Sequence, residues 1–166
     1  MNTITYRHPQ FSEGTALHQL VQTTPPLDVN SAYVYYLQCR DFASTCVVTT
    51  QEDTLLGFTT GYIRPSEPDT LFIWQIAVSP AACGMGVGLG MLNWLIQQPS
   101  CMGVSTVAAT ILRGNLASQS LFRKFARGHH AHVTTARFLP EAIPDDAPYA
   151  DEILFSVSPI SSEHIA

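Results

Sequence analysis

Three glycines alternate near the middle of the chain, in the run LFIWQIAVSPAACGMGVGLGML. Gly84, Gly86 and Gly88 follow an apolar stretch typical of a buried strand and precede leucines at helical spacing. Without side chains, such a loop lets the backbone approach a bound anion, and amides at the start of the next helix point toward that anion. The sequence therefore predicts a strand, a loop suited to a diphosphate, and a crossover helix.

Two common nucleotide-binding loops do not fit this spacing. No Gly-Lys-Ser/Thr closes the loop as in a P-loop, and Leu89 or Met91 stands where the dinucleotide fingerprint requires its last glycine. The loop also comes late in the order of predicted strands, whereas dinucleotide-binding folds place it after the first one. The alternative that remains is a glycine-lined turn that serves helix packing alone.

The rest of the pattern indicates one domain. Apolar and β-branched runs predict strands over residues 2–6, 45–50, 55–63, 71–78, 104–112, 132–138 and 152–157. Helical spacing predicts helices over residues 12–22, after Asn30 or Ser31 to about residue 40, from the glycine loop to residue 96, and over 115–126. Early hairpins followed by a crossover imply an α+β fold over residues 1–160, in which a mostly antiparallel sheet has helices on both faces. Residues 161–166 are expected to form a tail.

Charge and hydropathy exclude several classes of partner. Lys and Arg number 8 against 13 Asp and Glu, for a net charge of -5, so the electrostatic attraction that nucleic-acid binding needs is absent. The longest dense apolar stretch, residues 71–78, is far too short to span a bilayer, and the N-terminal residues lack the pattern of a signal peptide. We expect a cytoplasmic protein that binds neither nucleic acid nor membrane.

Cysteine and histidine spacing gives no sign of a metal site. The cysteines form no CxxC pair and are Cys39, Cys46, Cys83 and Cys101. The histidines of one short basic segment lack the i, i+4 helical relation and are His129, His130 and His132. Reduced thiols, a solvated histidine loop and no metal are the expectation.

Two motifs of the chain resemble the GNAT superfamily of acetyltransferases. The segment 83–88 is similar to the superfamily's Arg/Gln-x-x-Gly-x-Gly/Ala loop, except that Cys83 stands in the basic position. The segment NLASQSLF, residues 115–122, is similar to its Asn-x-x-Ala/Ser-x-x-Leu/Tyr-Phe/Tyr helix start. The resemblance implies the GNAT fold and acetyl-CoA as co-substrate. The CoA-binding residues that it implies are Ile76, Ala77, Val78, Cys83, Gly84, Met85, Gly86, Val87, Gly88, Asn115, Ser118 and Phe122.

Longer runs resemble one branch, the L-2,4-diaminobutyrate acetyltransferases. They are PPLDVNSAYVYYLQCRDFASTCVV, LFIWQIAV and DEIL, spread from about residue 25 to 154. This resemblance implies acetylation of the N4 amine in ectoine biosynthesis by a homodimer. It also implies an amine pocket lined by Asp28, Trp74 and Glu152, with Tyr33 nearby. That choice agrees with physical chemistry, because ammonium groups need anionic acceptors and favour an aromatic face.

Residue types alone leave other roles open for these side chains. Asp28 suits a cap of the second helix, Trp74 suits a core position, and Glu152 suits a solvated strand end. Arg40 suits either the substrate carboxylate or an ion pair with Asp41 or another acid.

The resemblance also implies direct transfer within a ternary complex. An alkylammonium titrates near ~10.4, so a base must remove a proton, and Glu152 is the first candidate and Asp28 the second. A backbone amide around Ile76 or Ala77 would stabilise the oxyanion. Phe122 occupies the place where many relatives have a tyrosine that protonates the thiolate, so CoA leaves as thiolate or Tyr149 supplies the proton.

Three rival functions stay open from sequence. The first is acetylation of another cationic amine, such as a polyamine, a basic amino acid or an antibiotic. The second, favoured by the missing basic residue at Cys83 and the missing tyrosine at Phe122, is a non-catalytic acyl-CoA-binding module. The third is an interaction protein that keeps only the fold.

Overall fold

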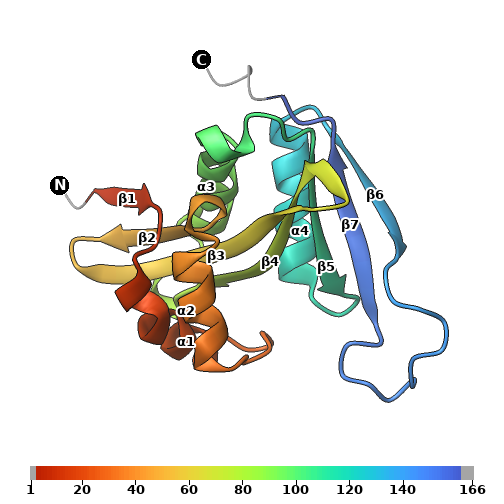
Figure 1. Cartoon of the computed structure of the whole chain (residues 1–166), viewed down its shortest axis with the longest axis horizontal. Coiled ribbons are helices and arrows are strands. Elements are labelled where there is room, and N and C mark those ends of the chain that lie inside the picture. Colours follow the sequence, from red (N-terminus) through yellow and green to blue (C-terminus); the bar gives the residue numbers. More distant parts are fainter. Residues whose placement is uncertain (1–2, 162–166) are drawn as a thin grey trace.

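A single mixed sheet organises the chain, of which the computed structural model describes residues 3–161. Its strands are β1 (Ile4–Arg7), β2 (Val47–Gln51), β3 (Thr54–Arg64), β4 (Glu67–Val78), β5 (Thr106–Leu112), β6 (His132–Arg137) and β7 (Glu152–Ser158). Its α-helices are α1 (Gly14–Gln22), α2 (Ala32–Arg40), α3 (Val87–Leu95) and α4 (Leu116–Gly128). The strand order is β1-β2-β3-β4-β5-β7-β6 (Figure 1).

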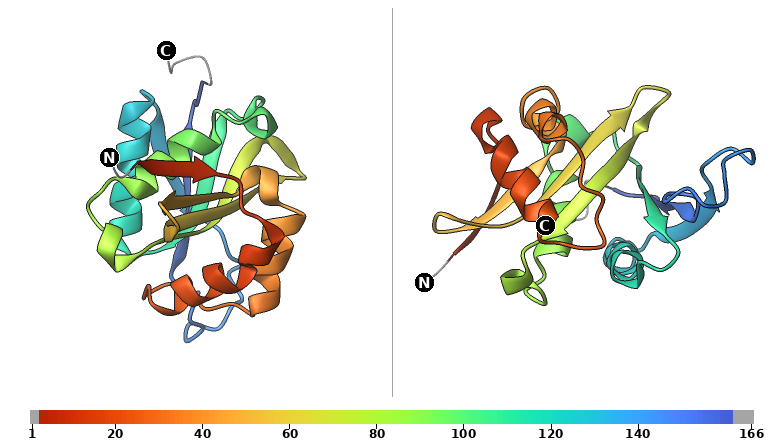
Figure 2. Two further views of the ribbon diagram at one scale, coloured as in Figure 1. Left: turned by 90° about the vertical axis from the view of Figure 1, so that its left-hand side faces the viewer. Right: turned by 90° about the horizontal axis from the view of Figure 1, so that it is seen from below.

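Two helix pairs cover the two faces of this sheet (Figure 2). Leu17 and Val21 of α1 and Tyr35 of α2 pack with Phe58 on one face, whereas α3 and α4 bury their apolar sides in a larger cluster on the other. Each helix presents one apolar stripe, and the sheet offers each stripe a flat surface on which to exclude water. The predicted α+β fold with helices on both faces is confirmed.

All strand pairs are antiparallel except β4 and β5, which are joined through α3. The predicted hairpins and the crossover are therefore confirmed. The strand predicted to begin at residue 71 begins earlier, since Arg64 pairs with Glu67 and β4 starts there. An Arg64–Glu67 ion pair of 2.8 Å stabilises this tight hairpin. The predicted start of the first strand and most of the predicted tail lie outside the described residues.

A β-bulge interrupts β4 at Trp74. Thr60 pairs with Gln75 and Gly61 with Ile73, so Trp74 has no partner on β3. One extra residue inverts the alternation of side chains along a strand. Ile73 accordingly packs in the cluster of α3 and α4, whereas Ala77 packs in the cluster of α1 and α2.

β4 and β5 part beyond the bulge. Their parallel pairing ends at Ile73 and Ala109, although β4 continues to Val78 and β5 to Leu112. β5 instead remains paired with β7 as far as Leu112 and Glu152. The sheet therefore opens between two of its central strands, and the backbone edge of β4 faces that opening.

Candidate active site

A cavity of about 360 Å³ occupies the opening between β4 and β5. Its walls come from the ends of both strands, the start of α4, the loop before α2 and the first residue of β7. The lining residues are Pro26, Leu27, Asp28, Asn30, Tyr62, Phe72, Ile73, Trp74, Gln75, Ile76, Ala109, Thr110, Ile111, Leu112, Asn115, Ser118, Phe122, Phe138 and Glu152. Such a concave pocket, in which apolar walls enclose several convergent polar groups, is typical of a small-molecule site.

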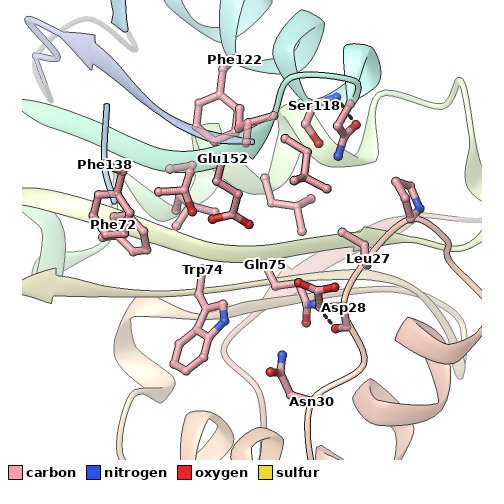
Figure 3. A pocket seen from close by; sticks show the side chains of 18 of the residues that line it. Leu27, Asp28, Asn30, Phe72, Trp74, Gln75, Ser118, Phe122, Phe138 and Glu152 are labelled. Carbon is pink, nitrogen blue, oxygen red and sulfur yellow. Dashed lines mark hydrogen bonds between the residues drawn. The ribbon is translucent and has the colours of Figure 1, made fainter. Parts of the chain in front are cut away.

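Three of the predicted amine-pocket residues meet around this cavity: Asp28, Trp74 and Glu152 (Figure 3). Among the described residues, no Lys, Arg or His side chain lines it. Two carboxylates without a basic neighbour in the lining create a negative potential, and the half-exposed Trp74 adds an aromatic face. This arrangement suits a ligand with ammonium groups.

The structure decides between several of the alternatives left by sequence. Ser31, and not Asp28, is the N-cap of α2, because its side chain accepts a hydrogen bond from the Tyr33 amide. Trp74 is 49% exposed and is therefore no core residue. The Arg40 Nε atom lies 3.9 Å from Asp41 Oδ1, and Arg40 does not line the cavity, so the ion-pair alternative holds.

Tyr33 lies apart from the other three predicted substrate-binding residues. It projects from α2 with 69% of its surface exposed, and it does not line the cavity. Sequence reasoning missed twelve residues that do line the cavity, and these are Pro26, Leu27, Asn30, Tyr62, Phe72, Ile73, Gln75, Ala109, Thr110, Ile111, Leu112 and Phe138. Asn30 and Gln75 lie within the two runs that resemble the diaminobutyrate acetyltransferases, next to the predicted residues Asp28 and Trp74. Phe138 directly follows β6, and nothing in its local sequence indicates a site residue.

The glycine loop turns through left-handed backbone conformations at two of its glycines. Gly84 and Gly86 have φ angles of +82° and +77°, in the left-handed region that other residues disfavour. A Cβ added at either position would meet nothing within 4 Å, so backbone conformation, not crowding, requires glycine there. Gly88 differs, because it lies inside α3 and a Cβ there would come within 3.3 Å of Leu121. Helix packing is therefore a reason for glycine at position 88, and the binding role of all three glycines remains a prediction.

The second motif forms one wall of the cavity. Asn115 is the N-cap of α4, and its side-chain oxygen accepts a hydrogen bond of 3.2 Å from the Ser118 amide. Asn115, Ser118 and the buried Phe122 all line the cavity, as does Ile76 of β4. Ala77 does not, because its side chain is fully buried against α1 and α2.

A family model described as "Acetyltransferase (GNAT) family" matches residues 14–126. The chain belongs to this family. The L-2,4-diaminobutyric acid acetyltransferase of Shouchella clausii is 38% identical over 160 residues, which cover 96% of this chain and 89% of that protein. The enzyme of the same name from Marinococcus halophilus is 36% identical and covers 97% and 93%. These relatives also place the chain among the diaminobutyrate acetyltransferases of the GNAT family.

A solved GNAT structure matches the whole fold. It is the diaminobutyrate acetyltransferase of Paenibacillus lautus in complex with L-2,4-diaminobutyric acid and coenzyme A. The two proteins are 33% identical, superpose with a TM-score of 0.89, and cover 96% of each other's chains. The family identified from the glycine loop and the α4 start is therefore confirmed.

No cysteine within the described part of the chain lines the cavity. Burial raises the pKa of Cys39 to about 11 and that of Cys46 to about 12, and it also raises the pKa of Cys101. A thiol with a raised pKa stays protonated near neutrality and is a poor nucleophile. Cys83 is exposed on the glycine loop, outside the cavity lining.

Residues 3–161 contain no cluster of three or more His, Cys, Asp and Glu side chains placed to hold a metal ion. None of their helices has the length and apolar character needed to cross a membrane.

Proposed function

We propose that this GNAT protein transfers the acetyl group of acetyl-CoA to the N4 amine of L-2,4-diaminobutyrate. The observation that carries the proposal is the pair of carboxylates, Asp28 and Glu152, that converge with Trp74 where β4 and β5 part. A diamino acid presents two ammonium groups, which match two anionic acceptors and an aromatic face. Whole-length similarity to diaminobutyrate acetyltransferases supports the same substrate.

The co-substrate would lie along the opening in the sheet. The left-handed glycines at 84 and 86 leave room for a diphosphate at the start of α3, where free amides and the helix dipole favour negative charge. The unpaired edge of β4 beyond Ile73 would direct the pantetheine arm toward Glu152. A β4 amide around Ile76 or Ala77 would donate to the developing oxyanion.

The reaction proposed is direct attack of the neutral amine on the thioester in a ternary complex. An alkylammonium must first lose a proton, since its pKa is near ~10.4. Glu152 is the proposed base and Asp28 the second candidate, because both carboxylates line the cavity.

The CoA sulfur is proposed to leave as a thiolate, while the tetrahedral intermediate loses the second proton of its nitrogen to water. Phe122, which lines the cavity beside the α4 start, has no proton to give. Tyr149 is about half exposed and does not line the cavity, although its carbonyl accepts a hydrogen bond from the Glu152 amide. A thiolate whose conjugate thiol has a pKa near ~8.5, as for cysteine, is a much weaker base than an amine and can leave without an acid. Retained turnover in Tyr149→Phe would agree with this step, and a large loss would restore Tyr149 as the acid.

One observation favours a second candidate substrate, a diamine without a carboxylate. No basic side chain of the described residues lines the cavity to receive a substrate carboxylate. A cytoplasmic location and a homodimer remain predictions for either substrate.

Thiol release from acetyl-CoA tests the proposal. The purified protein is offered L-2,4-diaminobutyrate, lysine, ornithine and putrescine in parallel, and the acetylated nitrogen is assigned by NMR. We expect selective release with diaminobutyrate and acetylation at N4. Greater thiol release with putrescine would make a diamine without a carboxylate the substrate. No release with any amine would favour a non-catalytic CoA-binding module.

A further inference from the structure

A buried, hydrogen-bonded pair of side chains supports the amine end of the cavity, where Asp28, Trp74 and Glu152 meet. The Tyr35 hydroxyl of α2 donates a hydrogen bond of 2.9 Å to Gln75 Oε1 of β4. Gln75 Nε2 donates one of 2.8 Å to the backbone carbonyl of Asp28 (Figure 3). Tyr35 is fully buried and Gln75 is 7% exposed, so water competes little for either bond.

The direction of both bonds follows from chemistry. A carbonyl oxygen only accepts, so the Gln75 amide must turn its NH₂ toward Asp28. Its oxygen then faces Tyr35, which must donate. The Asp28 carbonyl therefore fixes the orientation of the Gln75 amide, and Tyr35 supplies the donor that the amide oxygen then requires.

Asp28 depends on this support because its side chain has none. Within residues 3–161 no side chain holds the Asp28 carboxylate by a hydrogen bond or an ion pair. The residue is exposed in the connection between α1 and α2, so its position at the cavity follows from where its backbone is anchored.

The bulge at Trp74 makes the anchor possible. Because the alternation of side chains inverts at this residue, Gln75 faces α2 and Tyr35 instead of the cluster of α3 and α4. The same irregularity therefore places Trp74 at the cavity and Gln75 beneath Asp28.

We propose that Tyr35 and Gln75 are positioning residues that set the place of the Asp28 carboxylate for the amine substrate. The inference rests on the proposed function and adds to it a buried relay from α2 through β4 to the α1–α2 connection. Neither side chain exchanges a proton with the substrate.

The test compares Tyr35→Phe and Gln75→Glu with a matched control, Thr49→Val. Thr49 is also fully buried in the sheet, and its hydroxyl has no hydrogen-bond partner among the described residues. We expect the KM for the amine to rise about tenfold in Gln75→Glu and less in Tyr35→Phe, with the KM for acetyl-CoA unchanged. Thr49→Val should leave both constants unchanged.

A pH profile separates positioning from general damage to the fold. Protonated glutamic acid regains a donor, so the ratio of Gln75→Glu to wild-type amine KM should fall toward one as pH decreases. A ratio that stays constant with pH, or equal increases in both KM values, would overturn the inference. If Gln75→Glu does not fold, Tyr35→Phe decides the KM comparison alone.

Hydrogen exchange gives a readout that needs no activity. Amides of residues 27–30 should exchange faster in the relay variants than in wild type or Thr49→Val, and equal exchange would refute the anchor. A wild type that is inactive with every amine would refute the proposed function, and the exchange measurement would still decide the relay. If wild type prefers another amine, the KM comparison is made with that amine.

Discussion

The glycine loop and the amine end of the cavity are built in opposite ways. The loop is one continuous segment, residues 83–88, whose special feature is backbone conformation at Gly84 and Gly86. The amine end combines side chains from three distant segments, represented by Asp28, Trp74 and Glu152. In the proposed function, the loop offers amides to an anion and the amine end of the cavity offers carboxylates to a cation.

This difference matches the chemistry proposed for each end. A diphosphate is bound well by several backbone amides, which any sequence that adopts the turn supplies. An ammonium group needs acceptors with negative charge, which only side chains provide. Changes at the two ends should therefore affect different kinetic constants.

The largest expected effect is at the amine end. Glu152→Gln keeps the shape of the side chain but removes the proposed base, so kcat should fall by about 10²- to 10⁴-fold. The affinity for acetyl-CoA, measured by calorimetry, should not change. Asp151→Asn, at the exposed neighbouring carboxylate, is the control and should keep normal turnover. Normal turnover in Glu152→Gln would transfer the role to Asp28.

A smaller effect is expected from the backbone of the loop. Gly86→Ala forces a residue with a side chain to adopt a φ of +77°, at a cost of about 1–2 kcal/mol. We expect the KM for acetyl-CoA to rise about tenfold and the amine KM to stay the same. Gly103→Ala is the control, because Gly103 has no positive φ and a Cβ there meets nothing within 4 Å. An increase in the amine KM alone would contradict the separate roles proposed for the glycine loop and the amine end of the cavity.

Adding a positive charge to the loop should modestly increase its affinity for CoA. Cys83→Arg restores the basic residue typical of the GNAT loop at an exposed position, and a guanidinium forms charge-assisted bonds with phosphate. The Kd for CoA should decrease by up to about tenfold, more at low salt than at high salt. Cys83→Ala should leave the Kd unchanged, and unchanged or weaker binding in Cys83→Arg would argue against a diphosphate at this loop.

The smallest effect is expected outside both ends. Arg7 holds the pKa of Glu13 below its usual range through hydrogen bonds of 2.7 and 2.9 Å. A lowered carboxyl pKa stabilises the fold above the pKa of the unfolded chain, and this contribution disappears as pH falls through the folded-state pKa. Glu13→Gln should therefore lower the free energy of unfolding by about 1 kcal/mol at pH 7 and by less near pH 3.

Urea unfolding at the two pH values measures this difference. The control is Glu141→Gln, since the Glu141 side chain is 92% exposed in its pair with Arg137. Both KM values should remain those of wild type in both variants. A stability difference that grows toward low pH would contradict the direction of the Glu13 pKa shift.

Local patterns predicted most of the fold. Amphipathic spacing predicts the helices, and runs of apolar and β-branched residues predict the strands. Both patterns can be read locally because they depend on residues within a few positions of one another. The start of β4 at Glu67 was missed, since its first residues are polar and pair in a hairpin whose register is not visible locally.

The sequence by itself determined the glycine loop and the capped start of α4, because each is a contiguous segment whose conformation depends on its own residues. Only the tertiary structure decided the amine end. The bulge at Trp74 depends on pairing with β3, and it inverts which side chains face each helix layer. The separation of β4 from β5 then brings Asp28 and Glu152 to one cavity, through contacts between residues that lie far apart along the chain.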